Sequence, residues 1–280
     1  MNRTGRKRLV IAAAATAATA AMGVTGSFAQ SGAPAHGARA SHRVLPDLVQ
    51  ILPPRVRIAH KVSAVRGRRT LLTFSGAAEN HGVGPLVIDA RRPNLSTGSM
   101  TARQIVWHAN GVHEIVPTQV GTVKYVHSRD HNHWHLLNFM SYRLTTQSGA
   151  RIGRDHKTGY CLGDRYRIPG ASFPAEPQYP VYTSHCGKSR PGRLSIAEGI
   201  SVGFGDIYPE FLEGQFIDIT DVPTGNYVLV MRVNPTHKIL DEHPDNDVSS
   251  VNVRIVKRAG KAFAKIKKYC NNTNRCPVTG

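Results

Sequence analysis

Short apolar runs separated by turn residues dominate the chain from Leu45 onward. No comparably long amphipathic helical pattern interrupts them, and Gly-Pro, Asn-Gly and Thr-Gly-Asn segments mark the turns between them. The pattern predicts a mainly β protein, a β-sandwich with long irregular active-site loops. The expected strands cover residues 70–75, 85–89, 104–107, 113–116, 136–144, 216–222, 227–233 and 251–256.

The region 145–214 is longer and less regular than the other connections. Long irregular stretches in a compact domain are usually functional or disordered. Because this one contains cysteines that favour a disulfide, we interpret it as an ordered wall of an active site.

The first 29 residues are typical of a secretory signal peptide. A basic start precedes an Ala-rich apolar run that is too short and weak for a permanent membrane anchor, and Ser27-Phe28-Ala29 offers a small-residue cleavage site. We therefore expect a secreted, extracellular protein without a stable membrane anchor. The predicted divisions are a signal peptide at 1–29, a disordered leader at 30–44, a folded domain at 45–256 and a basic C-terminal tail at 257–280.

The formal net charge is +18, and removal of the signal peptide takes away only a few of these positive charges. Such a surface favours acidic partners or anionic cell-envelope polymers, and a solvated basic surface without a particular ligand explains it equally well. No recognised nucleic-acid motif is present, so we expect no nucleic-acid partner. Residues 257–268 are basic and helix-compatible, and either contact polyanions or act as a solubilising appendage.

The chain has four cysteines, an even number that suggests disulfides in an oxidising compartment. Sequence proximity favours Cys161 with Cys186 and Cys270 with Cys276, although three pairings are formally possible.

The segment 131–135, His-Asn-His-Trp-His, carries the strongest chemical signal. On a strand, three alternate imidazoles leave the same face, together with Leu137 and Phe139 if the strand continues to Leu144. Three histidines can hold copper, nickel or zinc and leave positions open for water, dioxygen or substrate. Trp134 then lies on the opposite face, where we interpret it as a core or rim residue.

Four segments together resemble the catalytic domain of the lysyl oxidase family. They are the histidine motif at 131–135 and the stretches 155–164, 199–208 and 215–222, in the family's order. The stretch 225–235 is similar to the family's closing strands, and the combination is more specific than any single motif.

The resemblance covers roughly residues 45–256, which it identifies as a lysyl oxidase-like catalytic domain. It implies a lysine tyrosylquinone cofactor formed from Lys157 and Tyr208. It also implies copper, held by His131, His133 and His135. The chain departs from the vertebrate pattern in having fewer cysteines and in carrying Arg129-Asp130 directly before the histidines.

The implied activity is the copper- and quinone-dependent oxidative deamination of primary amines, which makes the protein a copper-dependent amine oxidase. The substrates are lysine side chains of extracellular proteins or small primary amines, and dioxygen is reduced to hydrogen peroxide as ammonia and an aldehyde are released. The reaction needs a base, for which Asp206 and Asp164 are candidates, and His156 could help to keep Lys157 neutral. The alternatives are a secreted copper-binding or storage module and a noncatalytic adhesion module.

The segment 241–247, Asp-Glu-His-Pro-Asp-Asn-Asp, is acidic and loop-like. Its oxygens could bind calcium, but it lacks the EF-hand spacing, and a solvated turn is the simpler interpretation.

Overall fold

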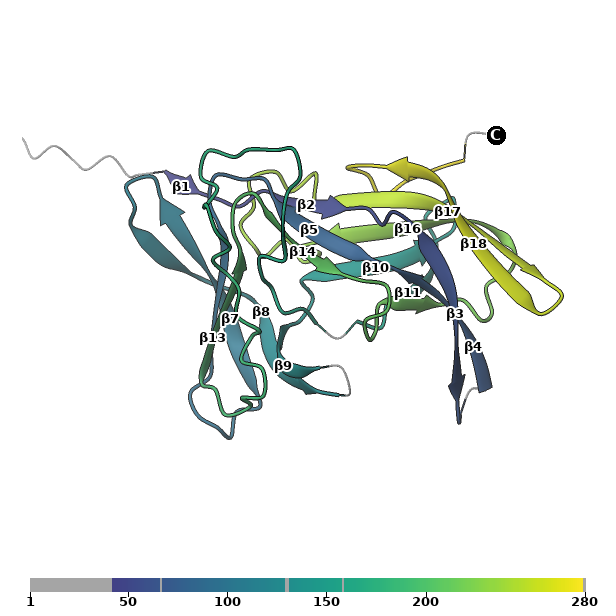
Figure 1. Ribbon diagram of the computed structural model, residues 1–280, viewed down its shortest axis with the longest axis horizontal. Helices are drawn as coiled ribbons and strands as arrows, with labels where there is room; N and C mark the ends of the chain where they lie inside the picture. Colours follow the sequence, from purple (N-terminus) through teal and green to yellow (C-terminus); the bar gives the residue numbers. More distant parts are fainter. Residues whose placement is uncertain (1–41, 66, 129–130, 158, 279–280) are drawn as a thin grey trace, which may run out of the picture. The chain divides into compact units, whose positions relative to one another are not determined.

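The computed structural model of the protein describes residues 42–65, 67–128, 131–157 and 159–278 (Figure 1). Contacts divide the chain into residues 1–39 and 40–280, and all described residues belong to the second unit. The predicted signal peptide and most of the predicted leader lie outside the described residues. Within them, no helix is long and apolar enough to cross a membrane.

Four antiparallel sheets make up the domain. The six-stranded sheet has the order β13 (Ser195–Ile200), β6 (Leu86–Arg91), β7 (Ser99–His108), β8 (His113–His127) and β9 (Asn132–Leu136), with β1 (Arg43–Val44) paired to β7. The five-stranded sheet has the order β11 (Arg151–Arg154), β10 (Met140–Thr145), β16 (Gly225–Val233), β17 (Val248–Arg258) and β18 (Lys261–Cys270). The four-stranded sheet has the order β12 (Tyr166–Arg167), β14 (Phe204–Tyr208), β5 (Gly76–Asn80) and β2 (Leu48–Ile51). The three-stranded sheet has the order β15 (Phe216–Asp218), β4 (Gly67–Phe74) and β3 (Val56–Ser63).

A single hydrophobic cluster joins the four sheets. Strands such as β7 supply it from alternate positions, because successive side chains of a strand point to opposite faces. In β5 and the first half of β17 both faces are covered, and consecutive residues are buried. The prediction of a mainly β fold is confirmed. The largest side chains that are fully buried in this core include Trp134, Tyr142, Tyr160, Phe74, Phe139 and Phe204.

The expectation of one continuous strand from the histidines to Leu144 is wrong. The chain turns at Asn138, whose φ of 61° lies in the left-handed region that asparagine tolerates better than most residues. As a result β9 pairs with β8 in one sheet, whereas β10 pairs with β16 in another. The turn therefore ends the histidine strand at Leu136 and breaks the apolar stripe predicted to extend it.

The region 145–214 is more regular than its sequence indicates, because it contains β11, β12, β13 and β14. Its irregular part is the stretch between β11 and β13, where β12 is the only described strand. The predicted disulfide between Cys161 and Cys186 is confirmed and fastens this stretch. The second predicted disulfide, between Cys270 and Cys276, is also confirmed.

Both ends of the predicted domain are extended by strands. Arg43 pairs with His108 and Val44 with Trp107, so the end of the expected leader belongs to the sheet. The helix-compatible interpretation of residues 257–268 is wrong, because β17 and β18 form an antiparallel hairpin there. In β18, partly buried Ala262, Ala264 and Ile266 alternate with exposed lysines and the exposed Phe263, a period of two that suits a strand.

The acidic segment 241–247 is a structured turn. The interpretation of this segment as a solvated turn is wrong for Asp247, which is fully buried. Asp241 accepts hydrogen bonds from the backbone N–H groups of Leu48 and His243, at 2.9 and 3.0 Å. Asn246 donates to Asp47 at 2.8 Å. The turn thus ties the region after β16 to β2.

Candidate metal and cofactor site

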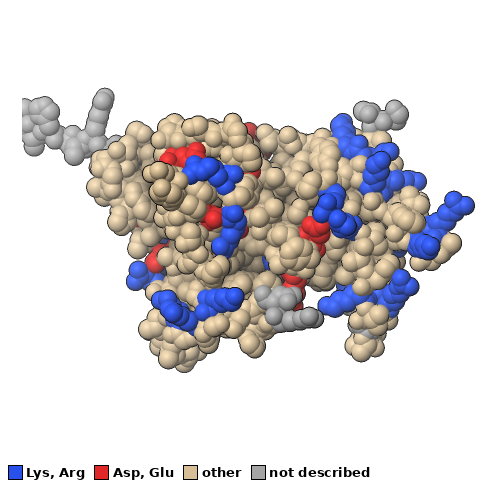
Figure 2. All heavy atoms as spheres, in the orientation of Figure 1, with Lys and Arg blue, Asp and Glu red and all other residues tan. Residues whose placement is uncertain are grey.

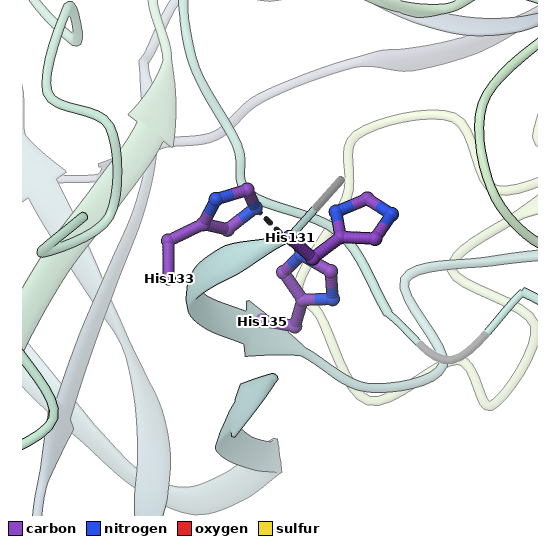
Figure 3. Close-up of side chains that lie close together, drawn as sticks. All are labelled: His131, His133 and His135. Atoms are coloured by element: carbon purple, nitrogen blue, oxygen red, sulfur yellow. Dashed lines mark hydrogen bonds between the residues drawn. The ribbon is translucent and has the colours of Figure 1, made fainter. Parts of the chain in front are cut away.

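The three histidines predicted to bind metal lie together at the start of β9 (Figure 3). The Nε2 atoms of His133 and His135 are 2.7 Å apart, and the ring centroids of His131 and His135 are separated by 4.8 Å. One ligand atom of each residue lies within 4.8 Å of those of the other two. β9 supplies two of the three imidazoles, and His131, which directly precedes the strand, supplies the third.

The surroundings keep the imidazoles of His133 and His135 neutral. Burial, followed by the neighbouring cationic and imidazole groups, lowers the pKa of His133 to about 4 and that of His135 to about 2. His135 is 1% exposed, and its Nδ1 has no hydrogen-bond partner among the described residues. Neutral imidazoles present the lone pairs that copper and zinc require, so this donor set fits such an ion.

Lys157 and Tyr208, the predicted cofactor residues, lie close together beside the histidines. The Nζ atom of Lys157 is 5.2 Å from the centroid of the Tyr208 ring and 3.5 Å from the carbonyl oxygen of Glu213. Burial lowers the pKa of Lys157 to about 8, while Asp206, Glu213 and Asp155 oppose this effect. A larger fraction of the amine is therefore neutral near pH 7 than in an exposed lysine.

A backbone bridge holds the Lys157 segment against the histidine strand. Leu136 and Tyr160 exchange two hydrogen bonds, N to O in both directions, at 2.8 and 2.9 Å. Gly159 permits this approach, since a Cβ atom there would lie 2.7 Å from the Cβ of His135. Along the same edge of β9, which faces away from β8, the backbone N–H of Trp134 donates to the carbonyl of Cys186 at 2.9 Å. The disulfide to Cys161 therefore closes a ring of contacts around the site.

Asp206 and Tyr208 come from alternate positions of β14 and share a short contact. The Tyr208 hydroxyl donates to Asp206 Oδ2 at 2.6 Å and also lies 3.1 Å from the carbonyl of Cys161. Burial raises the pKa of Asp206 to about 7, and it raises the pKa of Tyr208 well above its usual value. Asp206 can therefore exchange a proton near neutral pH, whereas the Tyr208 phenol stays protonated.

One cavity of about 360 Å³ brings the predicted residues together. Its wall also contains side chains that the sequence did not single out, namely Arg165, His185, Lys188 and Leu212. The Nε atom of Arg165 is 3.7 Å from Asp206 Oδ1, and its Nη2 is 3.3 Å from the carbonyl of Cys161. Their positions in the sequence give no sign of a site, because contacts between distant parts of the chain bring them to the cavity. Its lining includes His131, His133, His135, Lys157, Asp206 and Tyr208.

Tyr160 is a further residue that the sequence reasoning did not assign to the site. Its buried ring meets the Tyr208 ring edge to face, with centroids 4.8 Å apart, and the centroid lies 5.8 Å from the Lys157 Nζ. A second tyrosine thus stands nearly as close to the lysine as Tyr208 does. Tyr160 follows Lys157 by only three positions, but nothing in that spacing shows which way its ring points.

Three other side chains singled out from the sequence do not line the cavity and have structural contacts instead. Asp164 accepts bonds from the backbone of Val181 and Tyr182 and from both donors of Ser201, at 2.7 to 3.0 Å. It holds loops together and is absent from the cavity lining. His156 is exposed, and its ring stacks on Phe216. The core interpretation of Trp134 is confirmed, since that residue is 1% exposed.

Comparison with known proteins identifies relatives that match the part of the domain containing this site. The sequence profile of the Lysyl oxidase family matches residues 68–264. Human lysyl oxidase homolog 3 is 24% identical over 206 residues, which are 70% of this chain and 24% of the human protein. Zebrafish lysyl oxidase homolog 3A is 28% identical over 189 residues, and chicken lysyl oxidase homolog 2 is 29% identical over 142 residues. These matches cover 67% and 50% of this chain and 20% and 16% of the two relatives.

The chain thus spans about a quarter or less of the length of these curated relatives. The family match, in contrast, covers more than half of the chain and includes the histidine strand, the Lys157 segment and the strand that carries Tyr208. On this evidence the chain belongs to the lysyl oxidase family.

Proposed function

We propose that the protein is a secreted copper- and quinone-dependent amine oxidase that oxidatively deaminates primary amines. The observation that carries the proposal is the placement of the Lys157 Nζ 5.2 Å from the Tyr208 ring centroid. Both residues line the cavity that the three histidines also line. A lysine, a tyrosine and a metal-binding triad around one cavity are the components that the family's cofactors need.

His131, His133 and His135 would hold copper, and Lys157 and Tyr208 would be joined to form the quinone. Together these groups would supply the oxidation of a primary amine to an aldehyde, with ammonia released and dioxygen reduced to hydrogen peroxide. Neutral imidazoles are the ligand form that copper needs, and the depressed pKa values of His133 and His135 support this role.

The chain's own groups are arranged for the proton transfers that such chemistry needs. The Lys157 amine acts as a nucleophile only when it is neutral, and its pKa of about 8 supports that state. Asp206 Oδ2 lies 2.6 Å from the Tyr208 hydroxyl oxygen and can accept its proton. Asp206 also lines the cavity, and its pKa of about 7 suits a general base acting on a bound amine at neutral pH.

The cavity volume of about 360 Å³ suits a small amine or the side chain of a lysine. We therefore propose lysine side chains of extracellular proteins, or small primary amines, as substrates, with dioxygen as the second substrate. Export by the signal peptide predicted at residues 1–29 would place the protein among such substrates.

A copper-storage module remains the competing function, and it would need only the three histidines. Storage gives no reason for the Lys157 amine to lie 5.2 Å from the Tyr208 ring centroid, or for Asp206 to contact the Tyr208 hydroxyl. The two functions differ in whether a quinone forms.

Substitution of the cofactor tyrosine tests the proposal. Copper is added under air to metal-free wild-type protein and to Tyr208→Phe, and each is examined for visible absorbance, reaction with phenylhydrazine, a crosslinked peptide pair and amine-dependent peroxide. The wild type is expected to show all four. Tyr208→Phe should bind copper and show none of them, because the phenol is the cofactor precursor and not a metal ligand.

Tyr160→Phe is the matched control, since Tyr160 lies 5.8 Å from the same lysine nitrogen by its ring centroid. This variant should retain the crosslink between Lys157 and Tyr208. His133→Ala should lose both bound copper and the crosslink. A crosslink to Tyr160, or full peroxide production by Tyr208→Phe, would refute the cofactor assignment, and copper binding without any quinone in the wild type would favour storage.

A further inference from the structure

The outward face of the β17–β18 hairpin carries a regular group of cationic and apolar side chains, called here the basic hairpin face. The strand register places Arg254 opposite Lys265, Val256 opposite Phe263 and Arg258 opposite Lys261. Residues two apart on a strand share a face, so these side chains lie side by side. Two cation pairs thus flank a central apolar pair.

Among the residues that the structure describes, no acidic side chain forms an ion pair with these cations. The sequence from Val248 to Gly280 contains no aspartate or glutamate. In the view of Figure 2, lysine and arginine side chains gather over the part of the domain that carries β3, β4, β17 and β18.

On the opposite face of the same hairpin, a lysine stabilises the fold by hydrogen bonds to backbone carbonyl groups. Lys257 points the other way and donates from its Nζ to the carbonyl oxygens of Ile219 and Thr220, at 2.7 and 2.6 Å. Arg258 and Lys261, next to it in the hairpin, make no hydrogen bond of this kind among the described residues. Their charges are therefore available to a ligand.

The cation pairs work against the stability of the hairpin. Like charges directly opposite each other on paired strands are destabilising. Lysines on β18 alone would protect an open sheet edge from pairing with another chain, because β18 is the last strand of its sheet. Edge protection does not explain Arg254 and Arg258, which lie on the inner strand β17. Local rules are broken most often where a site serves function.

An exposed aromatic ring stands between the two cation pairs. Phe263 is 57% exposed, although the other face of β18 offers partly buried positions to apolar side chains. A flat apolar ring between cations matches a polymer that presents both apolar ring faces and anionic groups. Sugar rings bearing carboxylates or sulfates have this combination, whereas polyphosphate has the charge alone.

We propose that the basic hairpin face binds an acidic polysaccharide, with its anionic groups on Arg254, Arg258, Lys261 and Lys265 and a sugar ring on Phe263. The predicted export of the chain makes such a polymer of the cell envelope or extracellular matrix accessible. This binding site is separate from the cavity of the histidines, because its residues do not line that cavity. The proposal therefore does not depend on amine oxidase activity. Binding of the polysaccharide would hold the protein near the surface that carries this polymer.

The test measures binding of a fluorescent polyuronate oligosaccharide to the full mature chain by anisotropy, at low and high salt. Lys261→Gln/Lys265→Gln should bind about tenfold more weakly than the wild type, with a smaller salt dependence. The matched control is Arg103→Gln/Lys238→Gln, which removes the same charge from exposed positions elsewhere and should change affinity less than about twofold. Phe263→Ala, which keeps every charge, should also weaken binding several-fold.

Equal losses in the two double variants would overturn the proposal, because net charge would then explain the binding. Tighter binding of polyphosphate or of a single-stranded oligonucleotide, unaffected by Phe263→Ala, would overturn the choice of a polysaccharide. If Lys261→Gln/Lys265→Gln self-associates but binds the polyuronate as the wild type does, edge protection is the whole role of these lysines. Circular dichroism of each variant checks that the hairpin is folded.

Discussion

Burial determines the protonation of the side chains around the cavity. It lowers the pKa of Lys157 to about 8 and raises that of Asp206 to about 7, so that both move toward neutral pH. These shifts follow from removing a charge from water, and they need no special partner. Lys157 and Asp206 in the cavity can therefore exchange protons under conditions in which exposed lysine and aspartate keep one charge state.

Asp206→Asn is expected to reduce amine-dependent peroxide production by about a hundredfold or more while copper stays bound. A general base works when it is unprotonated, so the wild-type rate should rise as pH passes through about 7. The asparagine variant should lose this rising limb, which steady-state rates from pH 5.5 to about 9 would measure. Glu242→Gln, an exposed change outside the cavity lining, serves as control and should keep it. A rising limb that persists in Asp206→Asn would assign the base to another group.

At the scale of elements, the site depends on how closely one loop approaches one strand. The segment that carries Lys157 meets β9 through the two hydrogen bonds between Leu136 and Tyr160. A side chain at position 159 would collide with this pairing, because its Cβ would lie 2.7 Å from the Cβ of His135 and 3.0 Å from the Leu136 carbonyl. Glycine is needed here for close approach, and not for an unusual φ.

Gly159→Ala should therefore push the loop away from the histidine strand. We expect a destabilisation of about 1–3 kcal/mol, weaker copper binding and a lower yield of the crosslink. Gly98→Ala is the control, since a Cβ there meets nothing within 4 Å, and its stability should stay within about 0.5 kcal/mol of the wild type. Thermal unfolding and copper content measure both effects. Wild-type values for Gly159→Ala would show that the bridge does not position the site.

At the scale of the whole molecule, several carboxyl groups are buried in spite of the strongly basic surface. Burial raises the pKa values of Glu198 and Asp247 to about 8, and those of Asp155 and Asp241 to about 6. The folded chain therefore binds protons that the unfolded chain releases near pH 4. Each such group stabilises the fold at low pH, and this contribution is lost as pH rises to the folded-state pKa.

Metal-free protein should accordingly lose stability between pH 6.5 and about 8. Below about pH 6.5 the depressed pKa values of His133 and His135 act in the opposite direction, so the clearest window lies above it. Urea unfolding across this window should give a free energy that falls with pH. Glu198→Gln and Asp247→Asn should each reduce the slope, whereas Glu242→Gln, an exposed change, should not. A flat or rising profile in the wild type would contradict the protonated state of these carboxyls.

The sequence alone determined the local features of this protein. Alternating polar and apolar positions predict the strands, because the period of two is a property of each strand by itself. The spacing of His131, His133 and His135 and the proximity of Cys161 to Cys186 are likewise local. The predictions of secondary structure were wrong where the local sequence is compatible with two different conformations. Asn138 turns the chain between two sheets, and residues 261–270 form a strand where helix was also compatible.

Only the tertiary structure decided which distant residues meet. Lys157 and Tyr208 are brought together because the Tyr160–Leu136 bridge fixes one beside β9, while β14 carries the other from a different sheet. The resemblance implied this pair, but their separation, the approach of Tyr160 and Arg165, and the burial that shifts Asp206 all depend on packing. Packing brings together residues far apart in the chain, and desolvation acts only after they meet; neither is encoded in any short stretch of sequence.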